Sequence, residues 1–305
     1  MISSKSSSLH TISCDNRPSF LKHALWLLLN FFLNNLNFFF KKDKNLGLEY
    51  FHNNNAYEWL KKINTNNTPI RLACDLFWYN IPVNYIVENL KEIKVLDIGC
   101  GRGIYYNILK EIFGTHFKSY TGFDKKLRVS QDLRSKKDAK FIEDDVKNIQ
   151  KYLDGHNLII SQSFIEHIKY DIKFFEDLKY LESAGKPIMQ IHVFPSRLCL
   201  YSYLGHGIRH YNIRNVSKLT KCYSKKFTTK NLIALGSKNL NNYQLVNFTL
   251  TRIMRKKNIL EKDLQKYINE VALMLNRDNR LNKDYKIKNA ASYALVLQSN
   301  FKNLK

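Results

Sequence analysis

Apolar residues follow a repeating order between residues 93 and 194, where short apolar runs of strand length alternate with segments of helical period. The runs are IKVLDIG, SYTGFD, AKFIED, NLIIS and PIMQIHVF. Such alternation is typical of a parallel sheet covered by helices. Two more strands are expected at residues 242–253 and 291–299, with a helix at 259–277 between them. The pattern therefore predicts an α/β fold with a doubly wound, mostly parallel, seven-stranded sheet.

The N-terminal part has a different pattern. Residues 1–18 are polar, serine-rich and aperiodic, which predicts a mobile tail. Residues 19–92 are expected to form a helical extension, and residues 93–305 the main domain. Within the extension, residues 19–44 are the most apolar stretch, and their polar positions recur at spacings of 7, 4, 3 and 4. This spacing predicts one polar stripe on a helix, made of His23, Asn30, Asn34, Asn37 and Lys41.

Three interpretations of this apolar helix stay open. It could dock on the protein's own core. It could lie in the headgroup region of a membrane, with Trp26 buried and the asparagine stripe, Lys41, Lys42 and Lys44 facing water and anionic lipid. A membrane span is the least favoured, because each unpaired asparagine amide in hydrocarbon costs about 2 kcal/mol or more. A signal peptide fits poorly, since no A-x-A cleavage pattern follows.

Composition and charge narrow the function. A chain of 305 residues that is 44% hydrophobic is not disordered throughout. Its five cysteines form no C-x-x-C pair, which argues against a disulfide framework or a zinc site of standard spacing and indicates a reducing compartment. The formal charge is +23, and residues 183–260 contain no Asp or Glu. Either the composition is simply biased, or this stretch attracts an anionic substrate, nucleic acid or membrane.

The sequence VLDIGCGRG at residues 95–103 carries the clearest chemistry. Gly99, Gly101 and Gly103 follow a predicted strand and open a helix, where glycine allows positive φ and a close approach to a ligand. Asp97 precedes them, and an acid there suits a cationic ligand better than a phosphate. Asp124 ends the next strand, the position at which such folds place a carboxylate that binds ribose hydroxyls.

These residues resemble the class I S-adenosylmethionine-dependent methyltransferases, closest to the small-molecule group called type 11. The resemblance covers about residues 93–194 and implies a Rossmann-like methyltransferase domain over 93–305. Its cofactor half would be 93–194, and residues 195–305 would supply the substrate loop and the C-terminal strands. S-adenosyl-L-methionine is the implied cofactor. The implied cofactor-binding residues are Asp97, Gly99, Cys100, Gly101, Gly103, Asp124, Asp145, Val146, Ser161 and Gln162.

The chain also departs from relatives of this family. The E-x-x-E-H metal motif of the ubiquinone-biosynthesis O-methyltransferases is one carboxylate short here, because Ser163 stands at its first position before Glu166 and His167. No metal is therefore expected. The chain lacks an N-P-P-Y motif and a Pro-Cys pair, which argues against methylation of a nucleic-acid base.

Methyl transfer from a sulfonium is an in-line displacement, so positioning the acceptor is the main task and a base is secondary. His167 and His210 are the expected catalytic residues, with His192 and His206 as further candidates. The segment GHGIRHY at 205–211 follows the fifth strand, so His206, Arg209 and Tyr211 are expected to contact the substrate. The alternatives are that His167 braces its helix, His192 is a core group and 205–211 is a basic surface loop.

The sequence therefore predicts a cytoplasmic methyltransferase, peripheral on the inner face of a membrane if the apolar helix is interfacial. Its acceptor is expected to be small or carrier-linked and anionic, such as a glycan or a lipid-linked intermediate. An RNA hydroxyl, bound by the basic half through phosphates, is the alternative, although nucleic acid is the less favoured partner. A scaffold protein with a vestigial cofactor site is the third reading.

Overall fold

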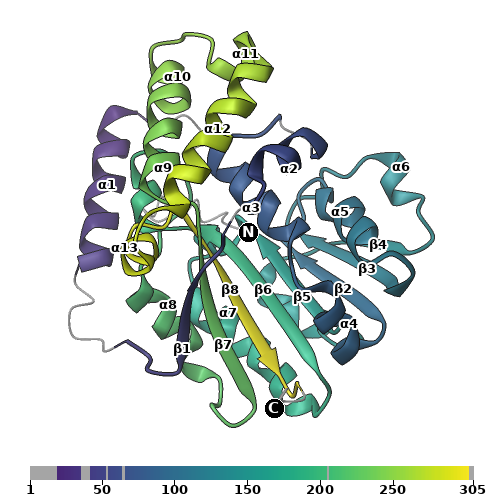
Figure 1. Cartoon of the computed structure of the whole chain (residues 1–305). Helices are drawn as coiled ribbons and strands as arrows, with labels where there is room; N and C mark the ends of the chain where they lie inside the picture. The colour runs from purple at the N-terminus through teal and green to yellow at the C-terminus, as the bar shows by residue number, and fades with distance from the viewer. Residues whose placement is uncertain (1–18, 36–41, 53, 64–65, 205, 302–305) are drawn as a thin grey trace, which may run out of the picture.

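A computed structural model describes residues 19–35, 42–52, 54–63, 66–204 and 206–301 and shows one twisted eight-stranded sheet with helices on both faces (Figure 1). The strand order is β1-β7-β8-β6-β5-β2-β3-β4. All neighbours are parallel except β8, which runs antiparallel to β6 and β7. The strands are β1 (Leu46–Tyr50), β2 (Ile93–Ile98), β3 (Phe117–Asp124), β4 (Ala139–Glu143), β5 (Leu158–Gln162), β6 (Ile188–Pro195), β7 (Thr228–Leu235) and β8 (Ser292–Ser299).

The helices cover the sheet in two layers and add a third cluster beside it. One face is covered by α3 (Pro69–Tyr79), α4 (Val83–Leu90) and α5 (Ile104–Phe113), and the other by α7 (Asp171–Leu178) and α8 (Ile213–Leu219). In the third cluster, α2 (Ala56–Lys62) and α3 pack against α9 (Lys238–Gln244) and α12 (Leu264–Asn279). The remaining helices are α1 (Phe20–Asn35), α6 (Gln131–Arg134), α10 (Thr251–Ile253), α11 (Ile259–Lys262) and α13 (Lys283–Lys288).

The predicted α/β fold is confirmed, and strands β2 to β6 and β8 lie where the sequence placed them. The predicted strand at 242–253 is wrong, because this segment is helical: α9 continues into a π-helical turn, η10 (Leu245–Leu250), and then into α10. Its place in the sheet is taken by β7, in which alternate side chains are buried. One of these is Lys230, whose ammonium bonds the Asp43 carboxylate at 2.8 Å. A buried lysine with a distant partner hides the strand from sequence reasoning.

The N-terminal extension is not wholly helical. Leu46–Tyr50 forms β1, which pairs in parallel with β7 and adds an eighth strand at the edge of the sheet. Helix α3 is largely buried, and the Trp78 indole donates to the Gln162 side chain at the end of β5 over 3.0 Å. Residues 46–90 therefore contribute to the sheet and to the surroundings of its carboxyl edge, as well as to the helical cluster.

Helix α1 docks on the domain through its polar edge. The Trp26 indole donates to the Gly207 carbonyl at 2.9 Å, and Trp26 is only 1% exposed. The fully buried Asn30 amide donates to the Ile208 carbonyl and accepts from the His210 N–H at 3.0 Å. The asparagine stripe thus turns inward at Asn30, which favours the interpretation in which the helix docks on the protein over the one in which this stripe faces water.

Three other residues of the predicted polar stripe, Asn34, Asn37 and Lys41, have no described side chain. Asn37 and Lys41 lie outside the described residues, and the side chain of Asn34 is not described. Within the described part of the chain, none of the helices combines the length and the apolar character needed to cross a membrane.

Replacing Asn30 by alanine should loosen α1. The substitution leaves the buried His210 N–H without its acceptor, which costs about 1 to 3 kcal/mol. Hydrogen exchange of the α1 amides should therefore become faster. Leu28→Ala, on the exposed side of the same helix, is the control and should change exchange little. Equal effects of both substitutions would contradict docking through Asn30.

Candidate active site

The glycine loop between β2 and α5 has the backbone that its sequence predicts. Gly99, Gly101 and Gly103 have φ of 80°, 54° and 71°, in the left-handed region that disfavours other residues. A Cβ on Gly99 would lie 2.3 Å from Cδ2 of Phe164, whereas a Cβ on Gly101 would have no atom within 4 Å. The loop therefore packs tightly at its start and borders open space at its centre, where a ligand can approach the backbone.

Two acids predicted from the sequence, Asp97 and Asp124, lie at the strand ends next to this loop. Asp97 is 1% exposed and accepts the Tyr120 hydroxyl at 2.5 Å, and its burial raises its pKa to about 7. Asp124 accepts the Gly101 N–H at 2.8 Å through one oxygen and the Lys126 N–H at 3.0 Å through the other. Each carboxylate oxygen of Asp124 has a second lone pair for ligand hydroxyls, so its place fits the expected ribose contact.

The expected adenine position lies one strand further along the same edge. Asp145 follows β4 and caps the 3-10 turn η5 (Val146–Tyr152) by accepting the Lys147 N–H at 3.1 Å. This hydrogen bond lowers the pKa of Asp145, and Lys125 lies 3.5 Å from its other oxygen. Because β2, β3 and β4 are parallel neighbours, Gly101, Asp124 and Asp145 meet at one edge of the sheet.

Ser161 and Gln162, which are expected to flank the cofactor at the end of β5, have different surroundings. Ser161 is fully buried and bonds Nδ1 of His192 at 2.8 Å, so it is part of the core. His192 is also fully buried, and burial lowers its pKa to about 3, which supports the core reading of this histidine. Gln162 lines a cavity of about 210 Å³. The next residue, Ser163, has φ of 51°, a strained backbone of the kind that gathers at functional sites.

This cavity, called the inner cavity below, is lined by an acid and a histidine that lie close together, Glu166 and His206. Glu166 in the turn η6 (Ile165–His167) has no exposed surface, and among the described residues neither carboxylate oxygen meets a donor at hydrogen-bond geometry. Nε2 of His206 lies 3.4 Å from Oε1 of Glu166, and the two neighbouring imidazoles keep the pKa of Glu166 low despite its burial. The cavity is lined by Ile70, Arg71, Cys74, Gln162, Ser163, Glu166, Phe194, Pro195, Tyr203, His206 and Ser292.

The predicted catalytic histidines His167 and His210 are not among the described residues that line this cavity. His210 is 1% exposed, packs edge-on against Trp26 and bonds the His206 carbonyl at 3.1 Å. Its burial lowers its pKa to about 4, so it is neutral near pH 7. The ring of His167 lies edge-on to that of His206, with 4.8 Å between centroids. Of the four candidates, His206 alone is among the described residues that line the inner cavity.

The structure also places Arg209 and Tyr211 away from the inner cavity. The Arg209 guanidinium bonds both oxygens of Asp171 at 2.9 Å and the Lys169 carbonyl at 2.8 Å. The Tyr211 hydroxyl, 1% exposed, also donates to Asp171. Both side chains thus bond the first residue of α7, and their expected role as substrate contacts stays a prediction.

Glu166, His167 and His206 also form a candidate metal group. Each offers one ligand atom, and these atoms lie within 4.8 Å of one another. Two imidazoles and a carboxylate suit Zn²⁺ or Fe²⁺. Sequence reasoning counted only the local motif and missed His206, which the loop brings in from forty residues further along the chain. The expectation of a metal-free enzyme stays a prediction.

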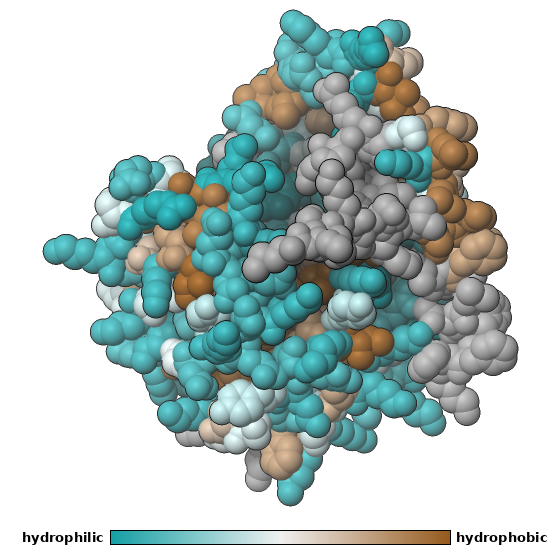
Figure 2. All heavy atoms as spheres, turned by 180° about the vertical axis from the view of Figure 1, so that it is seen from behind, coloured by the Kyte–Doolittle hydropathy of each residue, from teal (hydrophilic) through white to brown (hydrophobic). Residues whose placement is uncertain are grey.

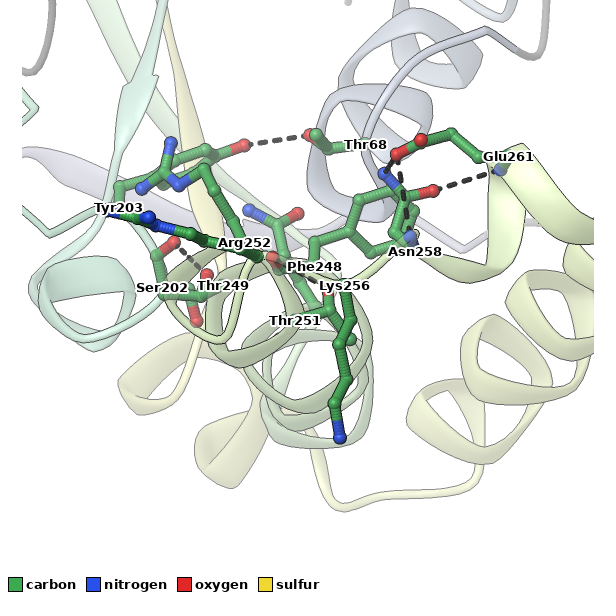
Figure 3. A pocket seen from close by; sticks show the side chains of 12 residues that line it. Thr68, Ser202, Tyr203, Phe248, Thr249, Thr251, Arg252, Lys256, Asn258 and Glu261 are labelled. Atoms are coloured by element: carbon green, nitrogen blue, oxygen red, sulfur yellow. Dashed lines mark hydrogen bonds between the residues drawn. The ribbon is translucent and has the colours of Figure 1, made fainter.

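A larger cavity of about 430 Å³, called the outer cavity below, opens between α3, the 202–203 turn and the helices from η10 to α11 (Figure 3). Arg252, Arg255 and Lys256 line it, all three exposed and, within the described chain, without an ion pair to an acid. Tyr203 lines both cavities and bonds Thr68 at 3.3 Å. The outer cavity thus adjoins the inner cavity at Tyr203.

Comparison with known proteins identifies the domain. Residues 71–186 match the family model described as a methyltransferase domain, and this range holds the glycine loop, Asp124, Asp145 and Glu166. The chain carries a methyltransferase domain. The resemblance that the sequence indicated is thereby confirmed, and the matched range starts in α3, before the expected start at residue 93. No curated protein matches the chain by sequence.

The chain is also similar to several solved structures. The plantazolicin methyltransferase BpumL, crystallised with a desmethylPZN analog and SAH, is 14% identical, with 80% of this chain and 93% of that chain covered and a TM-score of 0.43. A SAM-dependent methyltransferase from Archaeoglobus fulgidus is 16% identical, with 81% and 100% covered and a TM-score of 0.43. YcgJ from Bacillus subtilis is 10% identical, with 74% and 99% covered and a TM-score of 0.39.

The loop glycines provide a matched pair of substitutions. Gly101→Ala forces alanine into a left-handed backbone but meets no neighbour, so it should lower the free energy of unfolding by about 1 to 2 kcal/mol. Gly99→Ala adds a clash with Phe164 and should lose about 1 to 3 kcal/mol more. Urea denaturation measures both. Equal losses would show that Phe164 moves freely and does not fix the loop.

Proposed function

We propose that this protein is an S-adenosylmethionine-dependent methyltransferase that methylates a hydroxyl of a small or carrier-linked anionic acceptor. The observation that carries the proposal is the Glu166–His206 pair in the inner cavity, next to the segment that packs on the glycine loop. S-adenosylmethionine supplies the methyl group on a positively charged sulfur. The chain's own residues would hold the cofactor, orient the acceptor and accept its proton.

The residues at the strand ends fit this cofactor. The open space at Gly101 gives a ligand access to the loop backbone, and Asp124 and Asp145 present carboxylates at successive strand ends. Phe164 contacts Gly99, so the end of β5 and the inner cavity lie beside the same loop. An acceptor bound in the inner cavity would therefore lie close to a cofactor bound at the loop, which in-line methyl transfer requires.

His206 is the proposed general base. A proton on Nε2 can point to the Glu166 carboxylate, which leaves Nδ1 to accept the hydroxyl proton. The buried carboxylate of Glu166, 3.4 Å from Nε2 of His206, would stabilise the imidazolium that forms, because charges interact more strongly away from water. Glu166 thus acts through His206 and is a positioning residue.

The outer cavity supports an anionic acceptor. Three cations, Arg252, Arg255 and Lys256, and one acid, Glu261, line this cavity, so a negatively charged group could bind to the excess positive charge there while the hydroxyl reaches His206. Cations around a cavity favour a compact acceptor over RNA, for which a long basic groove with stacking aromatics is typical. A glycan or a lipid-linked intermediate that carries phosphate or carboxylate fits this description, and a lipid-linked acceptor would be met at a membrane surface.

The purified protein should bind S-adenosylmethionine. Titration calorimetry should detect binding, and Asp124→Ala should weaken it by about 1 to 3 kcal/mol, because the ribose hydroxyls would lose their acceptor. Asp132→Ala, on the exposed helix α6, is the control and should leave the affinity unchanged. A folded wild type that binds no cofactor would end the proposal.

His206→Gln should slow transfer without affecting the cofactor. Radiolabelled methyl transfer into fractionated lipid, glycan and RNA pools identifies the accepting pool, and the variant should reduce kcat there by roughly 10²- to 10⁴-fold. His116→Gln, an exposed histidine, is the control. Unchanged activity in His206→Gln would remove the base assignment. Loss of wild-type activity with a chelator and its recovery with Zn²⁺ would replace it by a metal held by Glu166, His167 and His206.

Lys256→Gln should raise the KM for the acceptor by roughly 10-fold, as expected for losing a charge-assisted contact. Lys257→Gln removes the same charge one position away, from a side chain that does not line the outer cavity, and should change KM much less. If both variants act equally and salt abolishes the difference from wild type, the charge works as a diffuse field and the outer cavity is not the anion site.

A further inference from the structure

Helix α1 exposes an apolar face to solvent. Its large apolar side chains Phe20, Leu21, Leu28, Phe31 and Phe32 are 45% to 89% exposed. At 100° per residue they fall on one arc of the helix, opposite the edge that carries Trp26 and Asn30. The helix therefore uses its polar edge to bind the protein and presents its apolar edge outward, the reverse of an ordinary amphipathic surface helix.

A second apolar face accompanies the first. Val246, Leu250, Ile253 and Met254 occur at i, i+4, i+7 and i+8 along η10 and α10, and each is 41% to 58% exposed. In Figure 1, α1 runs beside α9 and α10, and the turn η8 (Arg197–Leu200) contacts both α1 and α9. Figure 2 shows hydrophobic side chains along this border of the molecule. We call these nine side chains the apolar face.

Cations border the apolar face. Lys22 lies on α1, Lys42 and Lys44 precede β1, and all three are exposed. Arg252, Arg255, Lys256 and Lys257 border the second part and are also exposed. Residues 183–260 contain no acid, the next acid Glu261 is bonded to Asn258, and Asp43, between Lys42 and Lys44, is paired with Lys230. Exposed apolar groups beside cations are what an anionic lipid surface binds, through burial of the first and attraction of the second.

We propose that the apolar face attaches this protein to an anionic membrane surface, with α1 and α10 in the headgroup region. A second copy of the chain is a poorer occupant. Each copy carries a formal charge of +23, and a two-fold contact through this face would bring the same cations together. An exposed patch of this kind on a soluble chain is typical of an interaction site.

Attachment would place the outer cavity near the lipid. Arg252, Arg255 and Lys256 both line the outer cavity and border the apolar face, so the headgroup phosphate of a lipid-linked acceptor could enter from the membrane side. The attachment does not rest on the proposed methyl transfer, whereas this delivery of the acceptor does. The apolar face would bind the lipid surface as a whole, and the acceptor would be one lipid-linked molecule within that surface.

Flotation of the full-length protein with vesicles tests the attachment. The wild type should float at low salt with vesicles of phosphatidylcholine and phosphatidylglycerol, and not with phosphatidylcholine alone. Leu28→Ser with Phe31→Ser, and separately Ile253→Ser with Met254→Ser, should reduce the bound fraction roughly 10-fold or more. Ile172→Ser with Phe227→Ser removes two apolar groups elsewhere that are also about half exposed, and should leave flotation unchanged.

Three outcomes would overturn the proposal. The wild type could fail to float at low salt. Flotation could survive both apolar double variants, which would leave charge alone as the cause. Sedimentation could show a dimer that dissociates in the apolar double variants without any flotation, which would make the apolar face a contact between copies. S-adenosylmethionine binding by every variant checks folding, and flotation of a protein that binds no cofactor would refute the proposed function alone.

Discussion

The site depends on one tight piece of packing around residues 163–167. Gly99 on one side would place a Cβ against Phe164, and Gly207 on the other, with φ of 70°, would place one 2.8 Å from Cγ of Glu166. The segment is therefore held between two backbones that approach more closely than any side chain permits. Ile208 adds a hydrogen bond of 2.6 Å to the Glu166 carbonyl. This packing fixes the positions of the Glu166 carboxylate, the glycine loop and His206 relative to one another.

The parts of the site that sequence reasoning located are those determined locally. The glycine loop, Asp124 and Asp145 each follow a strand whose apolar run is visible in the sequence, and parallel strands bring their carboxyl ends to one edge. Strand β7 was missed because its inward positions include Thr228 and Lys230. These are satisfied by Glu182 and Asp43, which are distant in sequence. Conversely, residues 242–253 contain enough apolar and β-branched residues to suggest a strand, but tertiary contacts keep them helical.

Dependence on contacts that are distant in sequence also explains why the sequence could not show which histidine lines the inner cavity. Whether His206 or His210 faces the inner cavity depends on the turn at Gly207 and on Trp26 and Asn30, which approach from the far end of the chain. The charges divide in a similar way. Arg209 and Lys230 are neutralised by Asp171 and Asp43, acids that lie outside the acid-free stretch, whereas Arg252 and Lys256 stay available at the outer cavity. Net charge counted along the sequence could not separate these two groups.

The docking of α1 also has a consequence for synthesis of the chain. Gly207, which accepts the hydrogen bond of Trp26, lies 181 residues further along the chain. Strand β1 can join the sheet only after β7 has been synthesised, because β7 is the strand it pairs with. Ribosomes add about 5 to 20 residues per second, so an apolar helix and an unpaired strand emerge many seconds before their binding surfaces exist. During that interval the surface that covers Trp26 and Asn30 is absent, so the contacts that fix the His206 loop can form only after residue 210 has been synthesised.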